Sequence, residues 1–279
     1  MKPLQRFLIG LLLLCGISTA WPQEPAVQSS NLYAPFASYQ EAEQALRTGT
    51  ILKVKDLGSG TTHPMKVYLQ RNNVEFKAVF KTIDQHYHGI TRMQKNSEVD
   101  FKDSWMYEIA AYELDKLLGL NMVPPTVQRI YKGQKGSLQL WIEDAMTEKQ
   151  RKEMHLQPPD VDQWNRQILQ LRLFDNLIYN IDRNLGNLLI TSDWKIHMID
   201  HSRSFKTLDI LKAPNDLQLF SKSTMESLQN IDLLKLKACC SHYLTGPEMN
   251  TLLKRRDIIL EQYQTLLAEK GPAIYFPWN

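Results

Sequence analysis

Hydrophobic and polar residues alternate between residues 50 and 81, and this period of two predicts β-strands. The expected strands are 51–55, 66–69 and 74–81. Turns rich in Gly, Ser and Asn separate them, among them Gly58-Ser59-Gly60. The next stretch, 84–99, is polar without a clear alternation, and we expect it to be a loop.

Apolar residues at helical spacing then predict a helix over 104–118, which Asp103 or Ser104 can cap. Two further strands are expected after it, at 126–132 and 137–143. The order of elements up to this point is therefore β-β-β-α-β-β. An N-terminal arm at 21–49 ends in a short helix, where Ser38 and Glu41 have the spacing of a capping box.

Beyond residue 145 the pattern becomes mainly helical. The expected elements are a long helix over 161–179, a polar loop at 181–187, short strands at 188–191 and 195–200, and a last helix over 247–270. The predicted fold class is α+β. It has a small β-rich N-lobe at 50–145 and a mainly helical C-lobe at 146–279, with a cleft between them.

The first twenty residues have the plan of a secretory signal. Lys2 and Arg6 precede an apolar run, and Ser18 and Ala20 place small residues before a cleavage point. The run is short for a membrane span, although an uncleaved anchor is the alternative interpretation. We therefore expect a signal peptide at 1–20, no stable membrane span after cleavage, and a periplasmic or secreted protein.

Composition narrows the class of protein. Of the 279 residues, 43% are apolar and 23% are charged, which excludes a disordered or collagen-like chain. The net charge is +3, and Lys2 and Arg6 of the predicted signal supply two of these charges, so nucleic acid is not an expected partner. Three cysteines are too few for a disulfide framework, and Cys239 and Cys240 are expected to be thiols.

An acid, an amide and a second acid follow the long helix at informative intervals. Asp182 and Asn187 lie in the polar loop, and Asp200 ends the second short strand. The Asp-x-x-x-x-Asn interval is that of the protein-kinase catalytic loop, in which a carboxylate orients the attacking hydroxyl group. Asn187 and Asp200 would supply hard oxygen ligands for magnesium or manganese. Alone, each residue has an ordinary alternative role: a turn acid paired with Arg183, a turn amide and a strand-end acid.

The β-rich part carries the matching basic residue. Lys81 ends the third strand in Ala78-Val79-Phe80-Lys81, much as a lysine does in Val-Ala-Ile-Lys of kinases. Glu108 on the next helix would hold this lysine. Lys77 competes with Lys81, because residues four apart share a face of a strand, and Glu113 is the local competitor of Glu108. The alternative role for all four is a solvated surface charge.

Two further segments are predicted to contact a bound nucleotide. The turn Gly58-Ser59-Gly60 would cover phosphates with backbone N–H groups, although an ordinary hairpin turn fits it equally well. The segment 140–145 marks the change from strands to helices, and its backbone would face adenine.

The sequence resembles the Fam20 family of secretory kinases, which includes the Golgi casein kinase. The resemblance lies in the segments 108–120 with Val123-Pro124-Pro125, 174–183, and Ile199-Asp200 with Arg203-Ser204-Phe205. It covers roughly residues 50–205 and is weak between these segments. Phosphatidylinositol kinases and HipA-type kinases are more distant relatives.

The resemblance implies a two-lobed atypical protein-kinase-like fold that binds ATP with Mg²⁺ or Mn²⁺. Lys81 would bind phosphate, Glu108 would pair with it or help to place metal, Asp182 would be the catalytic carboxylate, and Asp200 would bind metal. The role of Asn187 follows the lipid-kinase and HipA pattern. His201-Ser202 departs from the Asn-Gly or Phe-Gly that relatives have after the metal-binding Asp.

The expected function is that of an exported ATP-dependent kinase with a hydroxyl-bearing substrate, a protein Ser or Thr first and a glycan second. The alternatives are a non-catalytic nucleotide-binding regulator and an enzyme that transfers AMP on the same fold.

Overall fold

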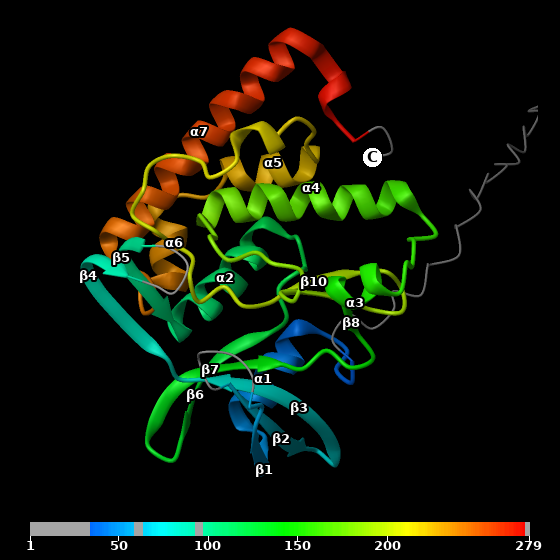
Figure 1. Cartoon of the computed structure of the whole chain (residues 1–279), viewed down its shortest axis with the longest axis vertical. Coiled ribbons are helices and arrows are strands. Elements are labelled where there is room, and N and C mark those ends of the chain that lie inside the picture. Colours follow the sequence, from blue (N-terminus) through cyan, green and yellow to red (C-terminus); the bar gives the residue numbers. More distant parts are fainter. Residues whose placement is uncertain (1–33, 59–63, 93–96, 277–279) are drawn as a thin grey trace, which may run out of the picture. The chain divides into compact units, whose positions relative to one another are not determined.

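The computed structural model describes residues 34–58, 64–92 and 97–276, all within one compact unit (Figure 1). The predicted signal peptide, Ser59 and Gly60 lie outside the described residues. Among the described residues, no helix has both the length and the apolar character that crossing a membrane requires.

The N-lobe contains a five-stranded antiparallel sheet with the strand order β1-β2-β3-β7-β6. Its strands are β1 (Thr50–Asp56), β2 (Met65–Arg71), β3 (Val74–Lys81), β6 (Thr126–Tyr131) and β7 (Gln134–Leu140). The predicted first three strands are confirmed. Strand β7 starts earlier than predicted, because Lys132 and Gly133, both with positive φ, make a tight two-residue hairpin turn.

The two faces of β3 separate the core from the candidate site. Phe76, Ala78 and Phe80 are buried in a core that the sheet shares with the helix α1 (Tyr39–Thr48). Because side chains alternate along a strand, Lys81 projects from the opposite face. Ser38 caps α1 as predicted, but the Glu41 carboxylate accepts from the backbone N–H of Ala37, so the reciprocal half of the capping box is absent from this described helix end.

The stretch 84–99, predicted to be a loop, is in fact part of a hairpin. Its strands are β4 (Asp84–Arg92) and β5 (Ser97–Ser104). Almost every residue of β4 is exposed, so neither face needs the alternating apolar residues that reveal a half-buried strand. Five strands, and not three, therefore precede the next helix.

That helix, α2 (Trp105–Leu118), lies between the sheet and the helical lobe (Figure 1). Ser104, and not Asp103, is its N-cap, with its side chain accepting from the backbone N–H of Met106. Gly119 ends the helix in the left-handed conformation. Most residues of α2 are buried, and Glu108 is among them.

The C-lobe is mainly helical. It contains β8 (Met146–Thr147), α3 (Glu148–Glu153), α4 (Val161–Ile178), β9 (Leu188–Ile190), β10 (Ile196–Met198), α5 (Lys222–Gln229), α6 (Leu233–Cys240) and α7 (Gly246–Lys270), with short 3₁₀ helices η1 (Pro214–Asp216) and η2 (Gly271–Ile274). The small sheet has the order β10-β9-β8. A large core joins α2 to these helices. Cys239 and Cys240 are free thiols, as predicted.

Candidate functional site

Lys81 joins the two lobes through a three-residue ion cluster. Its Nζ lies 2.5 Å from Glu108 Oε1 on α2 and 2.9 Å from Asp200 Oδ1 after β10. Glu108 is 1% exposed on its side chain and Lys81 is 12% exposed, whereas Asp200 is 37% exposed. The cluster is therefore shielded from solvent on the α2 side and accessible to solvent on the Asp200 side.

The charges of this cluster stabilise one another. Burial by itself would lower the pKa of Lys81, but the carboxylates of Glu108 and Asp200 outweigh burial and hold that pKa above its ordinary value. Burial would likewise raise the pKa of Glu108, yet Lys81 and His201 beside it hold that pKa below its ordinary value. Both groups are therefore charged at neutral pH.

The two competing residues make other contacts. Lys77 forms an ion pair with Glu143 at 2.9 Å, at the surface. Glu113 forms an ion pair with Lys116 one turn further along α2, at 3.0 Å. Lys81 and Glu108 therefore differ from Lys77 and Glu113 in facing each other and the C-lobe.

The loop after α4 is fixed by Arg183, which uses all five of its N–H donors. Its Nε and Nη2 bind the Asp175 carboxylate on α4 at 2.9 and 3.1 Å. Its Nη1 donates to the backbone carbonyls of Asn187 and Ile199, and Nη2 also contacts the His201 ring at 2.9 Å. Arg183 thus pairs with Asp175, and not with Asp182 as the alternative interpretation of that acid requires.

Asp182 and Asn187 are held together by a backbone contact. The Asn187 side-chain nitrogen donates to the backbone carbonyl of Asp182 at 2.8 Å, which leaves the amide oxygen for another partner. The Asp182 carboxylate is half-buried and has no hydrogen bond or ion pair to any described residue. Its position comes from the backbone, where its N–H donates to Asn180 Oδ1.

The hairpin of β9 and β10 connects the two groups of residues. Asn187 precedes β9, and Asp200 follows β10 by two residues, so the predicted strand ends earlier than expected. The Ile199 N–H donates to the Asn187 carbonyl at 3.1 Å. Asp200 has a φ of 61°, a left-handed conformation that a non-glycine residue rarely adopts. Such strain is frequent at functional sites.

The predicted phosphate-covering turn is described only at Gly58, which has a φ of 63° and donates its N–H to Asp56 Oδ1 at 2.8 Å. In the connecting segment 140–145, the Trp141 N–H donates to the Lys77 carbonyl at 3.0 Å. This N–H is therefore committed to the sheet.

The sequence did not indicate a place in the candidate site for His201 or Asp103. His201 is fully buried and lies between Arg183 and Glu108. Asp103 is 5% exposed, and burial raises its pKa, with the Asp200 carboxylate adding to the effect. The signal for His201 was its departure from the residues that relatives have after the metal-binding Asp. Asp103 had no sequence signal beyond a helix cap, because its burial comes from packing.

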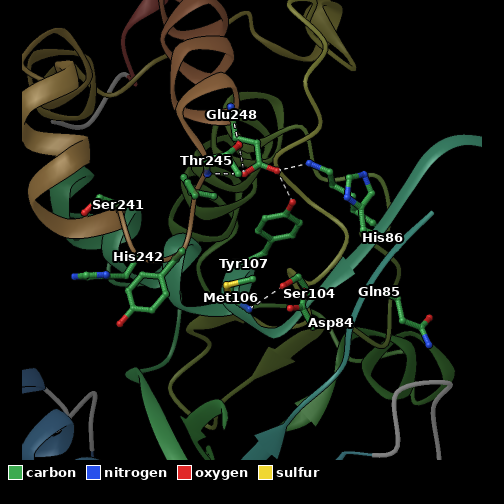
Figure 2. Close-up of a pocket in the computed structure, with 13 residues that line it drawn as sticks. Asp84, Gln85, His86, Ser104, Met106, Tyr107, Ser241, His242, Thr245 and Glu248 are labelled. Carbon is green, nitrogen blue, oxygen red and sulfur yellow. Dashed lines mark hydrogen bonds and ion pairs between the residues drawn. The ribbon is translucent and has the colours of Figure 1, made fainter. Parts of the chain in front are cut away.

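A pocket of about 320 Å³ lies beside the first turn of α2 (Figure 2). Figure 2 shows Tyr107 and Thr245 directed at Glu248 at the start of α7. The Tyr107 hydroxyl donates to Glu248 at 2.5 Å, and Lys102 on β5 donates to the same oxygen at 2.5 Å. Because Tyr107 immediately precedes Glu108, these contacts fix the turn of α2 that carries Glu108.

The sheet, the central α2 and the helical lobe define a kinase-like, two-lobed fold. No protein-family model and no curated protein matches the chain. Among solved structures, hydra Fam20, determined with sugar, matches with a TM-score of 0.61 and 16% identity, over 85% of this chain and 91% of that one. The Helicobacter pylori proinflammatory kinase CtkA matches with a TM-score of 0.53 and 13% identity, over 81% and 98%. The predicted Fam20-like fold is therefore confirmed.

Proposed function

We propose that the protein is an exported kinase that transfers the γ-phosphate of ATP to a hydroxyl group, first of all a Ser or Thr of a protein. The observation that carries this proposal is the contact of Lys81 Nζ with both Glu108 and Asp200. A lysine at the end of β3, held by a helix carboxylate and facing an acid of the C-lobe, suits the binding of nucleotide phosphates.

The loop after α4 supplies the group that acts on the acceptor. Asp182 has a carboxylate without an ion pair to any described residue, and Arg183 fixes the backbone around it. A carboxylate in this state can orient a hydroxyl group and accept its proton. Lys81 would bind phosphate, and the turn that begins at Gly58 would cover it.

Mg²⁺ or Mn²⁺ fits the oxygen donors that remain. The side-chain oxygen of Asn187 is not used by its amide contact, and Asp200 is partly exposed. No three His, Cys, Asp or Glu side chains form a metal cluster within the described ranges. Two protein ligands suit magnesium, which is usually bound by one or two carboxylates together with nucleotide phosphates and water. When bound, the cation would neutralise phosphate charge.

The two solved structures with a similar fold suggest which acceptors to test. CtkA is described as a kinase, and hydra Fam20 was determined with sugar. A protein hydroxyl is our first acceptor, and a glycan is the second. The exposed side of the Asp200 carboxylate is the side from which substrates would approach the cluster.

The test uses purified protein, labelled ATP and either Mg²⁺ or Mn²⁺, with an extract of exported proteins and glycans as the acceptor. We expect labelled product with the wild type and none with Asp200→Asn. Asp162→Asn, an exposed acid on α4, is the matched control and should behave as the wild type. Full activity of Asp200→Asn would contradict the assignment.

Intact-mass analysis identifies the transferred group. A mass gain of one phosphate supports the kinase, and a gain of AMP means that nucleotidyl transfer is the reaction. Nucleotide binding without any transfer to acceptor or enzyme means that the protein is a regulator. Export is tested separately by sequencing the N-terminus of the mature protein, which we expect to start at Trp21.

A further inference from the structure

His201 lies between the two groups of candidate site residues and contacts both. Its ring Nε2 lies 2.9 Å from Arg183 Nη2, and its ring Nδ1 lies 3.6 Å from Glu108 Oε2. Its backbone N–H donates to the same Glu108 oxygen at 3.1 Å. A continuous series of contacts therefore runs from Asp175, through Arg183, His201 and Glu108, to Lys81.

The neighbours of the ring decide which nitrogen carries the proton. A guanidinium group has only donors, so Arg183 donates and Nε2 of His201 must accept. The proton of the neutral ring is then on Nδ1, which faces the Glu108 carboxylate. The ring has one accepting side and one donating side, and each side meets a group of complementary character.

Because the His201 ring is buried, its polar contacts affect the free energy of the folded protein. His201 is 0% exposed, with its ring perpendicular to that of Phe174 at 5.9 Å between centroids. Its Nδ1 has no hydrogen-bond partner among the described atoms. A buried N–H without an acceptor costs free energy, so a small rotation that brings Glu108 Oε2 closer is favourable. A residue that only filled space would require neither polar neighbour.

We infer that His201 is a positioning residue that fixes the Glu108 carboxylate, and through it Lys81, to the loop that carries Asp182. One oxygen of the Glu108 carboxylate binds the N-lobe, and the other binds the C-lobe. Oε1 accepts from Lys81 at 2.5 Å, while Oε2 accepts from the backbone of His201 and faces its ring. His201 thereby sets the plane of the carboxylate that holds Lys81. The kinetic consequences of this inference rest on the proposed function.

The first test observes the tautomer directly. Protein labelled with ¹⁵N-histidine is studied by long-range ¹H–¹⁵N correlation, and the His201 signals are assigned by their loss in His201→Phe. We expect a protonated, pyrrole-like Nδ1 and an unprotonated, pyridine-like Nε2. The opposite tautomer, or a doubly protonated ring, would overturn the inference without any measurement of activity.

The second test compares two substitutions of His201. Phe keeps an aromatic ring but removes both polar contacts, whereas Asn keeps a donor near the position of Nδ1. We expect His201→Phe to lower kcat by about 10- to 100-fold, because displaced site groups lose that much, with a smaller change in KM for ATP. His201→Asn should recover part of kcat. Wild-type kcat in His201→Phe, or no recovery in His201→Asn, would contradict the positioning role.

The two tests separate this inference from the proposed function. A wild-type protein that transfers phosphate but has the proton on Nε2 overturns the inference alone. A wild-type protein that binds and transfers nothing, yet has the proton on Nδ1, overturns the proposed function and supports the placement of His201.

Discussion

The candidate site has two halves that are built in different ways. In the ion-pair half, the side chains of Lys81, Glu108 and Asp200 position one another by direct charge contacts. In the loop half, the side chain of Asp182 has no such contact with a described residue, and Arg183 holds the backbone around it. The first half is paired and largely buried, and the second presents a carboxylate that no described side chain binds.

Because of this difference, substitutions in the two halves are expected to affect the stability of the fold and the proposed reaction to different degrees. Removing one member of a buried ion cluster leaves an uncompensated charge, so the ion-pair half contributes to both the fold and the site. Removing a carboxylate that contacts no described residue is expected to leave the fold intact, so under the proposed function Asp182 would serve the reaction alone.

The largest effect is expected in the loop half. Asp182→Asn should lower phosphoryl transfer by about 10³-fold, within the range for loss of a general base. Its free energy of unfolding should change by less than about 0.5 kcal/mol, because the side chain is half-buried without an ion pair to described residues. Transfer assays and urea unfolding of the same preparation measure both quantities. A large loss of stability would contradict the comparison.

The next effect is expected in the ion-pair half. Lys81→Met removes the cation between two carboxylates and should lower the free energy of unfolding by about 3 kcal/mol at pH 7. The loss should shrink as the pH falls towards 4. In the wild type Lys81 holds the pKa of Glu108 low, whereas in the variant Glu108 regains an ordinary or raised pKa and is neutralised by acid. A loss that is independent of pH would argue against this coupling.

A third prediction concerns the β9–β10 hairpin that both halves share. Burial lowers the pKa of His197 on β10 to about 4. The unfolded chain binds this proton near pH 6.5, so stability should fall by about 2 kcal/mol between pH 7 and pH 5 and stay constant above pH 7. His197→Gln should remove this share of the dependence and leave the share of the buried His201, whose pKa burial also lowers. His88→Gln, whose side chain is 83% exposed, is the control and should leave the dependence unchanged. Denaturant unfolding across this pH range measures it.

The smallest effect provides the matched control for Lys81. Lys77→Met makes the same substitution four residues earlier on the same strand and removes an exposed pair with Glu143. The expected loss is no more than about 1 kcal/mol, as for other surface ion pairs, with transfer activity retained. An effect as large as that of Lys81→Met would mean that the strand, and not the ion cluster, is responsible.

Local patterns predicted most of the fold. Gly119 marks the end of α2, and α4 and the first three strands follow from hydrophobic spacing, because these signals act within a few residues. The start of α2 was left open between Asp103 and Ser104, and the structure places the cap at Ser104. The hairpin 84–104 was missed because β4 and the first half of β5 are largely exposed, so burial imposed no alternation on them. The turn between β6 and β7 was predicted to be longer than the two residues Lys132 and Gly133. The start of β7 was missed because that strand contains no β-branched or aromatic residue.

The sequence indicated which residues could form the candidate site, but it did not indicate most of the contacts between them. The interval from Asp182 to Asn187 placed both on one loop, and the structure places them in contact. The pairing of Arg183 with Asp175 was not predictable, because Asp182 and Asp175 are both within reach of an arginine in sequence. His201 is adjacent to Asp200 in the chain, but its role depends on groups from α2 and from the loop after α4.

The sequence by itself determined the two-lobed arrangement without the 84–104 hairpin, the C-terminal end of the central helix at Gly119, and a short set of acids, amides and lysines. Only the tertiary structure shows that Lys81 and Glu108 contact each other across the lobe boundary, whereas Lys77 pairs with Glu143 and Glu113 with Lys116. The two lysines share a residue type and an element, as do Glu108 and Glu113, so local patterns treat the members of each pair as equivalent. The choice depends on which side chains meet across the lobes, and that distance is fixed by the packing of α2 between the sheet and the helical core.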